Sequence, residues 1–308
     1  MTKGAPSVIN KKNRIREGSR TADAVIYLVA ALAAFLCLYP LYYVFVLSLS
    51  EPMVAATMRV YWWPKGLYTG GYSRILTDSR LWISYRNTIF YAIVQALGML
   101  FTCCTFAYPL SVKGLKGRKF VNIFLLTPMY ISGGTIPTVL LILQTGLYNT
   151  MWALILPGIY SVWYIILVRS YFGTIPESLR EAARIDGASH YQTLWNVYIP
   201  TSKPILAVIA LYTIVGVWNS WFRPALYLTS QNLQPLQLYL RRILVENSIN
   251  LSEEMASDEL VAAAMAQRVS NNQLKYTVII VSSLPMLVAY PFFQQYFVKG
   301  VMLGSLKE

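Results

Sequence analysis

Residues 177–200 read ESLREAARIDGASHYQTLWNVYIP, and this charged stretch lies between two long apolar segments of the chain. Its first half predicts a short helix. Thr174 stands three residues before Glu177 with Pro176 between them, a capping-box spacing that tolerates an early proline. The helix is expected to stop at Gly187, because glycine readily adopts the left-handed conformation that ends many helices. The stretch therefore begins as a compact, capped helix.

The second half of the same stretch predicts another short helix with one apolar face. Ser189 stands three residues before Gln192, which is again a capping-box spacing. Apolar side chains then recur with the i, i+3, i+4, i+7 spacing of a helix face, at Tyr191, Leu194, Trp195 and Tyr198. Pro200 and Pro204 end this helix and open the next apolar segment. Residues 177–200 are thus predicted to form a helical hairpin.

The rest of the chain has the composition of a membrane protein. Of its 308 residues, 56% are hydrophobic and 13% are charged, whereas soluble domains carry about 25% charged residues. The apolar residues cluster into segments long enough to cross a bilayer as helices. These segments are residues 24–49, 87–110, 120–143, 151–172, 204–228 and 276–297. The predicted fold class is an all-α polytopic membrane protein with six transmembrane helices, the third of them interrupted by SGGTIP at residues 132–137.

The distribution of Lys and Arg predicts the orientation. Residues 111–119 hold four basic residues and no acid, whereas residues 144–150 carry no charge. Because cytoplasmic loops are enriched in basic residues, both termini are expected inside the cell. The membrane domain then spans residues 24–299, with the hairpin on its cytoplasmic side. Residues 1–23 become a basic cytoplasmic segment and residues 300–308 a cytoplasmic tail.

Residues 229–275 are then expected outside, as a small helical cap. Two amphipathic stretches in this segment, residues 234–244 and 259–269, can each form a helix on the outer surface. The acidic residues of the same segment are expected to form a solvated patch, with contact to an outer partner as the alternative. The cap would cover the outer mouth of the membrane domain.

The composition also excludes several functions. A formal charge of +13 would favour nucleic-acid binding in a soluble protein, but in a membrane protein basic residues set orientation, so no nucleic-acid partner is expected. Three cysteines, one histidine and no CxxC spacing predict no metal site. The six apolar segments contain no Asp or Glu, and the chain has no GxxxxGK[ST] phosphate loop. The chain is therefore predicted not to be an enzyme.

The hairpin resembles the EAA loop of permeases of binding-protein-dependent ATP-binding-cassette importers. In that family EAA is followed by three residues, a glycine, nine residues and Ile-x-Leu-Pro. The residues that match in register are Glu181, Ala182, Ala183, Gly187 and Pro200, while Val197 and Ile199 replace the two apolar positions. Residues 153–189, 215–228, 235–244 and 290–308 also look like the carbohydrate-uptake subgroup, especially its lipoprotein/multiple-sugar members in Gram-positive bacteria.

The resemblance implies the type I importer permease fold and a set of partners. These are a second homologous permease subunit, a cytoplasmic ATPase dimer, an extracytoplasmic solute-binding lipoprotein, a sugar or oligosaccharide substrate, and the lipid bilayer of a bacterial cytoplasmic membrane. ATP and Mg would be bound by the ATPase, and no cofactor by this chain. The hairpin would dock into the ATPase and couple ATP hydrolysis to alternating access. The implied coupling residues are Arg180, Glu181, Ala182, Ala183, Arg184, Asp186, Gly187 and Ser189.

Aromatic and amide side chains in the fifth apolar segment are candidates for a substrate pathway, because an aromatic ring can cover the C–H face of a sugar. Tyr212, Asn219 and Arg223 fall on one helix face. The alternative is that these aromatics anchor the helix at the membrane surface or pack between helices. The candidate pathway residues are Tyr130, next to the SGGTIP break, and Tyr212, Trp218, Asn219 and Trp221.

Two other functions remain as alternatives. An ATP-independent channel or exporter would have no need of the EAA-type hairpin. A membrane-embedded transferase would need acid–base groups, and the six apolar segments offer no acidic residue for it. The hairpin itself could also be a plain polar connector, although two consecutive capping boxes and the family register argue against that.

Overall fold

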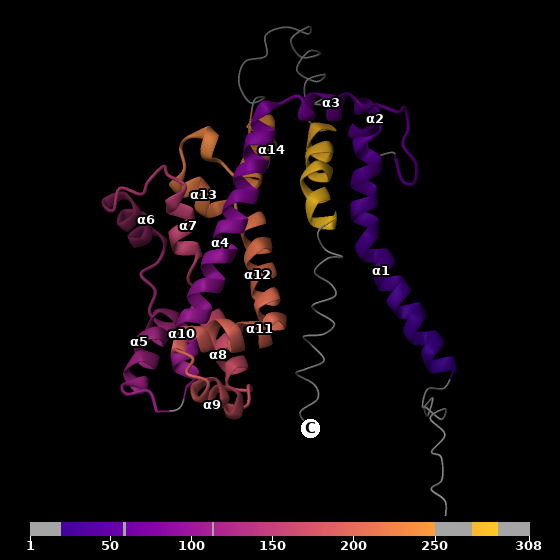
Figure 1. Ribbon diagram of the computed structural model, residues 1–308. Helices are drawn as coiled ribbons and strands as arrows, with labels where there is room; N and C mark the ends of the chain where they lie inside the picture. Colours follow the sequence, from indigo (N-terminus) through magenta and orange to yellow (C-terminus); the bar gives the residue numbers. More distant parts are fainter. Residues whose placement is uncertain (1–19, 58–59, 113, 250–272, 289–308) are drawn as a thin grey trace, which may run out of the picture.

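Helices make up the folded part of the chain in the computed structural model, which describes residues 20–57, 60–112, 114–249 and 273–288 (Figure 1). The two longest are α1 (Arg20–Ser48) and α4 (Ser79–Ser111). The others are α2 (Pro52–Ala56), α3 (Gly70–Leu76), α5 (Arg118–Tyr130), α6 (Thr135–Gln144), α7 (Trp152–Gly158), α8 (Val162–Phe172), α9 (Glu177–Ile185), α10 (His190–Thr193), α11 (Ile199–Thr201), α12 (Lys203–Trp218), α13 (Phe222–Tyr227), α14 (Leu236–Ile249) and a helix over Gln273–Val288. The described residues contain no strand, only an isolated bridge between Ser50 and Leu67. The all-α prediction is confirmed.

Several of these helices are apolar and long enough to cross a membrane. Helices α1, α4 and the stretch Trp152–Phe172 qualify on their own. Two bent pairs, Arg118–Tyr130 with Thr135–Gln144 and His190–Thr201 with Lys203–Trp218, raise the number to five if each pair is one span. Helix Gln273–Val288 is apolar but shorter, and its predicted continuation to residue 297 lies outside the described residues. Six spans with both termini inside therefore stay a prediction.

Helix α4 forms the centre of the fold, and α8 and α12 pack along it. Figure 1 shows α12 running beside α4 for most of its length. The buried side chains between them form one apolar cluster at the end of α4 that leads to the hairpin, including Cys103, Ala107, Ile165, Val168 and Ile209. A second cluster joins the other end of α4 to α3, α12, α14 and helix Gln273–Val288 through Leu81, Trp218, Leu236 and Val278.

Buried polar side chains of α4 tie the start of α14 to this central helix. The Nδ2 atom of Asn87 donates to the carbonyl oxygens of Asn232 (2.7 Å) and Gln234 (3.2 Å). The backbone N–H of Leu236 donates to Thr88 Oγ1 at 2.8 Å. A hydrogen bond inside an apolar environment satisfies groups that are costly to bury alone. These bonds fix the segment between α13 and α14 against α4.

The chain is bent where the sequence contains glycine or proline next to an apolar helix. The third apolar segment ends as α5 at Tyr130 and resumes as α6 at Thr135, with an angle of 112° between the two helices. Gly134, which precedes α6, has a φ of +84°, a conformation that side chains with a Cβ rarely adopt. The break that SGGTIP predicts is thus present. Helix α1, by contrast, continues through Pro40.

Parts of the sequence-based prediction fall outside the described residues. These are residues 1–19 of the basic segment, the second helix expected in the cap at 259–269 with its acidic neighbours, and the tail at 300–308. The first expected cap helix, at 234–244, corresponds to α14.

Candidate functional site

The hairpin is built from α9 and α10 around a glycine turn. Gly187 has a φ of +77°, and the N–H of Ala188 donates to the carbonyl of Ala183 at 2.9 Å, which closes the end of α9. Ser189 and Gln192 form the predicted capping box: Gln192 N donates to Ser189 Oγ at 3.3 Å, and Ser189 N donates to Gln192 Oε1 at 2.7 Å. The turn and the second cap are therefore as the sequence predicts.

The first predicted cap is wrong. Helix α9 starts after Pro176, and no side chain caps it. The hydroxyl of Thr174 instead donates to the carbonyl of Tyr171 at 2.7 Å, because Thr174 still belongs to the turn that ends α8. Pro176 then holds the extended conformation that precedes a helix, with a φ of −56° and a ψ of 134°. The hairpin thus depends on one capping box, at its second helix.

The single apolar face predicted for the second helix is also wrong. Residues Leu194–Tyr198 form a π-helical turn between α10 and α11. Its wider turn changes which side chains share a face. Leu194 and Tyr198 are buried, whereas Tyr191 and Trp195 are 75% and 57% exposed. The exposed aromatics therefore belong to the outer surface of the hairpin and not to its base.

The base of the hairpin is packed firmly against α4 and α8. The ring of Tyr198 lies 4.9 Å from the ring of Tyr108 and 5.2 Å from that of Phe172, both in edge-to-face geometry. Burial raises the pKa of the Tyr198 phenol, so this side chain stays neutral in the packed base. A displacement of the hairpin must therefore carry the ends of α4 and α8 with it, since close-packed interiors transmit strain.

Most of the surface of α9 is exposed within the described residues. No residue of α9 is buried. Ile185 is 86% exposed, and the charged residues on either side of it in the sequence, Arg184 and Asp186, are exposed as well. The residues expected to couple the hairpin to a partner are half-buried (Arg180, Ala183) or exposed (Glu181, Ala182, Arg184, Asp186, Gly187, Ser189). An exposed apolar surface rimmed by charge is typical of a protein–protein contact.

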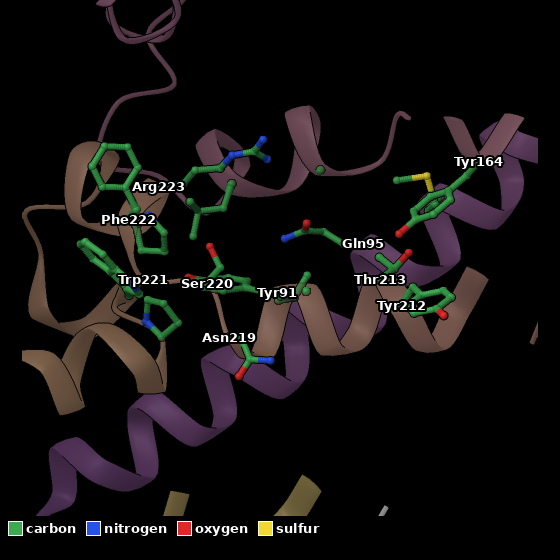
Figure 2. A pocket seen from close by; sticks show the side chains of 17 residues that line it. Tyr91, Gln95, Tyr164, Tyr212, Thr213, Asn219, Ser220, Trp221, Phe222 and Arg223 are labelled. Carbon is green, nitrogen blue, oxygen red and sulfur yellow. The ribbon is translucent and has the colours of Figure 1, made fainter. Parts of the chain in front are cut away.

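A cavity of about 460 Å³ lies between α4, α7, α8, α12 and the segment that leads into α13 (Figure 2). Figure 2 shows Tyr164, Tyr212 and Thr213 at one end, Trp221, Phe222 and Arg223 at the other, and Gln95 between them. The lining residues are Tyr91, Gln95, Met99, Leu154, Gly158, Tyr164, Tyr212, Thr213, Gly216, Val217, Asn219, Ser220, Trp221, Phe222, Arg223, Pro224 and Pro235. The lining contains aromatic rings, amides, hydroxyls and one guanidinium, and none of these residues is acidic.

Three of the five candidate pathway residues line this cavity, namely Tyr212, Asn219 and Trp221. Trp218 does not. It is 6% exposed and packs in the apolar cluster around Leu81, with its ring 6.2 Å from that of Tyr85. Tyr130 lies apart from the cavity at the end of α5, where its side chain is 84% exposed.

The contribution of α4 and α8 to the cavity is not apparent from the sequence pattern. Gln95 is the clearest omission, since an amide inside an apolar segment requires a partner. It makes no hydrogen bond to the described residues, and its Oε1 lies so close to Gly158 that a Cβ there would be only 1.9 Å away. Its amide therefore remains available to a ligand. Tyr91, Tyr164, Thr213 and Ser220 were also missed, and their types alone carry no signal.

The described residues contain no group of three His, Cys, Asp or Glu side chains that could hold a metal ion. Cys103 and Cys104 are free and buried in the apolar cluster around α4. What the site offers is thus a polar and aromatic cavity and, at the other end of α12, an exposed hairpin.

Comparison with known proteins identifies the family. Residues 11–303 match the family described as "Binding-protein-dependent transport system inner membrane component". The chain belongs to this family. The resemblance inferred from the hairpin is thereby confirmed, and the chain is a membrane transport component of the ABC importer permease type.

Individual relatives are similar to this chain over most of their length. The chain is 32% identical to Protein LplC of Bacillus subtilis (strain 168) over 87% of this chain and 88% of that protein. It is 30% identical to the polygalacturonan/rhamnogalacturonan transport system permease protein YtcP of the same organism, over 94% and 99% of the two chains. A crystal structure of a bacterial ABC transporter involved in the import of the acidic polysaccharide alginate superimposes with a TM-score of 0.79 at 31% identity, covering 91% of this chain and 99% of that one. The permease fold is therefore shared along almost the whole chain.

Proposed function

We propose that this chain is a transmembrane permease subunit of an ATP-driven, binding-protein-dependent importer of sugars or oligosaccharides in a bacterial cytoplasmic membrane. The observation that carries the proposal is the exposed hairpin, mounted on α4 and α8 and followed directly by α12. The substrates named for YtcP and for the alginate importer, both polysaccharides, support the substrate class. The chain supplies the path and its partners supply the energy.

In this proposal the hairpin receives the motion of a cytoplasmic ATPase dimer, which binds ATP and Mg. Helix α12 has 16 residues and is therefore about 24 Å long. It starts two residues after the helical end of the hairpin, and residues of its other half line the cavity. One straight helix thus joins the hairpin to the cavity. Alternating access by rigid-body rocking needs an element of this kind.

The proposal also includes the partners and the orientation expected from the sequence. Six spans with both termini inside place the hairpin in the cytoplasm and α14 outside. A second, homologous permease pairs with this chain, and a solute-binding lipoprotein delivers substrate from outside. The transported sugar passes the cavity at Tyr212, Asn219 and Trp221, where rings cover its C–H faces and amides bind its hydroxyls. Trp218 supports this wall through packing, and Tyr130 would meet substrate only at a surface completed by the second permease.

Replacement of Gly187 by valine tests the coupling role. A β-branched residue at a φ of +77° is strained by about 1–3 kcal/mol, so the end of α9 must change its path. We expect the purified importer with Gly187→Val to lose coupling between ATP hydrolysis and transport while membrane insertion is retained. Gly146→Val is the matched control, since Gly146 also has a positive φ of +71° and open space around it. Coupled transport at the normal rate by the Gly187→Val importer would contradict the proposal.

Deletion of residues 177–200 separates this function from an ATP-independent channel. An importer without its hairpin should lose both its association with the ATPase and its transport. If both survive, the chain works without the ATPase and the proposal fails.

A further inference from the structure

Two arginines and two serines line a separate cavity of about 390 Å³ at the end of the fold that carries the hairpin. Arg118 is the first residue of α5, and Arg169 lies in the last turn of α8. Ser111 ends α4, and Ser170 follows Arg169. Three helices thus bring two guanidinium groups and two hydroxyls to one hollow, whose other lining residues are Ile166 and Gly173.

Neither arginine of this cavity forms an ion pair with a carboxylate of the described residues. The Nη1 atom of Arg169 donates to Asn122 Oδ1 at 2.8 Å, which fixes the guanidinium but leaves its charge uncompensated. Arg118 lies close enough to Arg169 for the two charges to repel each other. Both side chains are half-buried, and no carboxylate lines the cavity. Two like charges held together in this way are stabilised by an anion between them.

The surroundings indicate what kind of anion fits. Apolar side chains on the first two turns of α5 point away from the protein: Phe120, Ile123 and Phe124 are 74%, 57% and 70% exposed. Both arginines sit at the same end of apolar segments, so the cavity lies at the depth of a lipid phosphate while these side chains reach the acyl region. Guanidinium groups suit phosphate oxygens because they donate two parallel hydrogen bonds.

We propose that Arg118, Arg169, Ser111 and Ser170 form a binding site for the phosphate of an anionic phospholipid, with its acyl chains along α5. In the proposed orientation the lipid belongs to the inner leaflet. The site adjoins the hairpin, because Ser111 and Gly173 also line the neighbouring cavity that contains Glu177, Arg180 and Tyr198. A bound headgroup therefore rests against the joint between α8 and α9.

The test is lipid retention by the full chain, purified in mild detergent and analysed by native mass spectrometry with phosphatidylglycerol or phosphatidylcholine. We expect the wild-type chain to retain phosphatidylglycerol in preference to phosphatidylcholine. Each of Arg118→Gln and Arg169→Gln should weaken the apparent affinity by roughly fivefold, the effect of one basic residue near an anionic membrane surface. Arg169→Lys, which keeps the charge, should restore most of the binding lost in Arg169→Gln.

Lys119→Gln is the matched control. It removes the same charge from the neighbouring residue, which is exposed and does not line the cavity, so phosphatidylglycerol retention should stay at the wild-type level. Loss of lipid binding in Arg118→Gln cannot be attributed to misfolding, because the Arg118 side chain makes no hydrogen bond to the described residues.

Three results would overturn the inference. Equal retention by the wild type and by both glutamine variants would mean that the basic residues only set orientation. Displacement of the lipid by inorganic phosphate at millimolar concentration would assign the cavity to a free anion. Loss of phosphatidylglycerol when the ATPase is added would mean that this partner covers the cavity. Because retention is measured without transport, failure of this inference and failure of the proposed importer function are distinguishable.

Discussion

Helices α1 and α4 are the two longest helices among the described residues, with 29 and 33 residues, and both are apolar enough to cross a membrane. Their surroundings differ sharply. None of the most apolar stretch of α1 is buried within the chain, whereas 39% of that of α4 is. Figure 1 shows α1 leaning away from the other helices toward its N-terminal end, with its C-terminal end beside α2. There Val46 and Leu47 pack against Ala55 and Val60.

The difference between the two helices lies in their polar residues. Residues 24–46 of α1 contain only apolar and tyrosine side chains, with one proline and one cysteine. Helix α4 carries Asn87, Thr88 and Gln95 in an equally apolar context, and all three are buried. Because a buried polar group needs a partner, each of them requires protein or a bound ligand beside it. Polar residues inside an apolar helix thus mark the helix that packs within its own subunit.

Leucine-to-alanine substitutions should show the largest difference in stability between the two helices. Leu81 in α4 is 1% exposed, and Leu81→Ala should destabilise the subunit by about 2–5 kcal/mol through loss of packing. Leu28 in α1 is 68% exposed, so Leu28→Ala should leave the thermal midpoint of the isolated subunit unchanged. Thermal unfolding of both purified variants in detergent gives the answer. Equal losses would mean that α1 packs within the subunit as closely as α4 does.

Asn87→Leu should have the next largest effect. The substitution keeps the size of the side chain but leaves the carbonyls of Asn232 and Gln234 without their donor, at a cost of about 1–3 kcal/mol. Faster hydrogen exchange at the start of α14 than at α12 would place the loss where we expect it. An unchanged exchange pattern would show that these bonds do not hold α14 against α4.

Loss of a pH-dependent contact at the N-terminus of α4 should have the smallest effect on stability. The Tyr239 hydroxyl donates to Asp78 Oδ2 at 2.7 Å, and Asp78 also caps α4 by accepting from Arg80 N. Burial and the nearby Asp78 carboxylate raise the pKa of Tyr239 above its ordinary value of 10.0. The contact therefore contributes fully below pH 10.0, and its contribution is lost as the pH rises toward the raised pKa.

Tyr239→Phe is the variant that tests this contact. It should lower stability by about 0.5–1.5 kcal/mol at neutral pH and remove this part of the decline above pH 10. Unfolding midpoints of the wild type and the variant, measured side by side over the alkaline range, should converge as the pH rises. A constant difference between them would contradict the assignment.

The parts of the fold that the sequence predicts correctly are those set by local chemistry. Gly187 turns the hairpin because its φ is positive, Ser189 and Gln192 cap each other, and the glycines after Ser132 interrupt a helix. The predicted cap at Thr174 is wrong because a capping-box spacing does not reveal that the Thr174 hydroxyl donates to a carbonyl at the end of the preceding helix. The π-helical turn was not predicted because the spacing of apolar residues looks the same whether the local hydrogen bonds are α-helical or π-helical.

The candidate cavity was predicted on one side only. Tyr212, Asn219 and Trp221 come from a single continuous segment, so helical spacing places them together. Gln95 and Tyr164 reach the same cavity from α4 and α8, and helix spacing within one segment says nothing about which helices become neighbours. Trp218 lies outside this cavity, in the apolar cluster around Leu81, and lines a second hollow together with Asn219 and Trp221.

Asn149 joins two loops that are far apart in the sequence. It adopts a φ of 57°, its N–H donates to the carbonyl of Tyr227 at 2.9 Å, and its Oδ1 accepts from the N–H groups of Thr229 and Ser230. Few side chains combine a tolerance for this conformation with an oxygen in reach of two amides. These three hydrogen bonds of Asn149 hold the loop before α7 and the loop after α13 together. Any motion that separates these two loops must break three hydrogen bonds at one residue, so the loops move together or not at all.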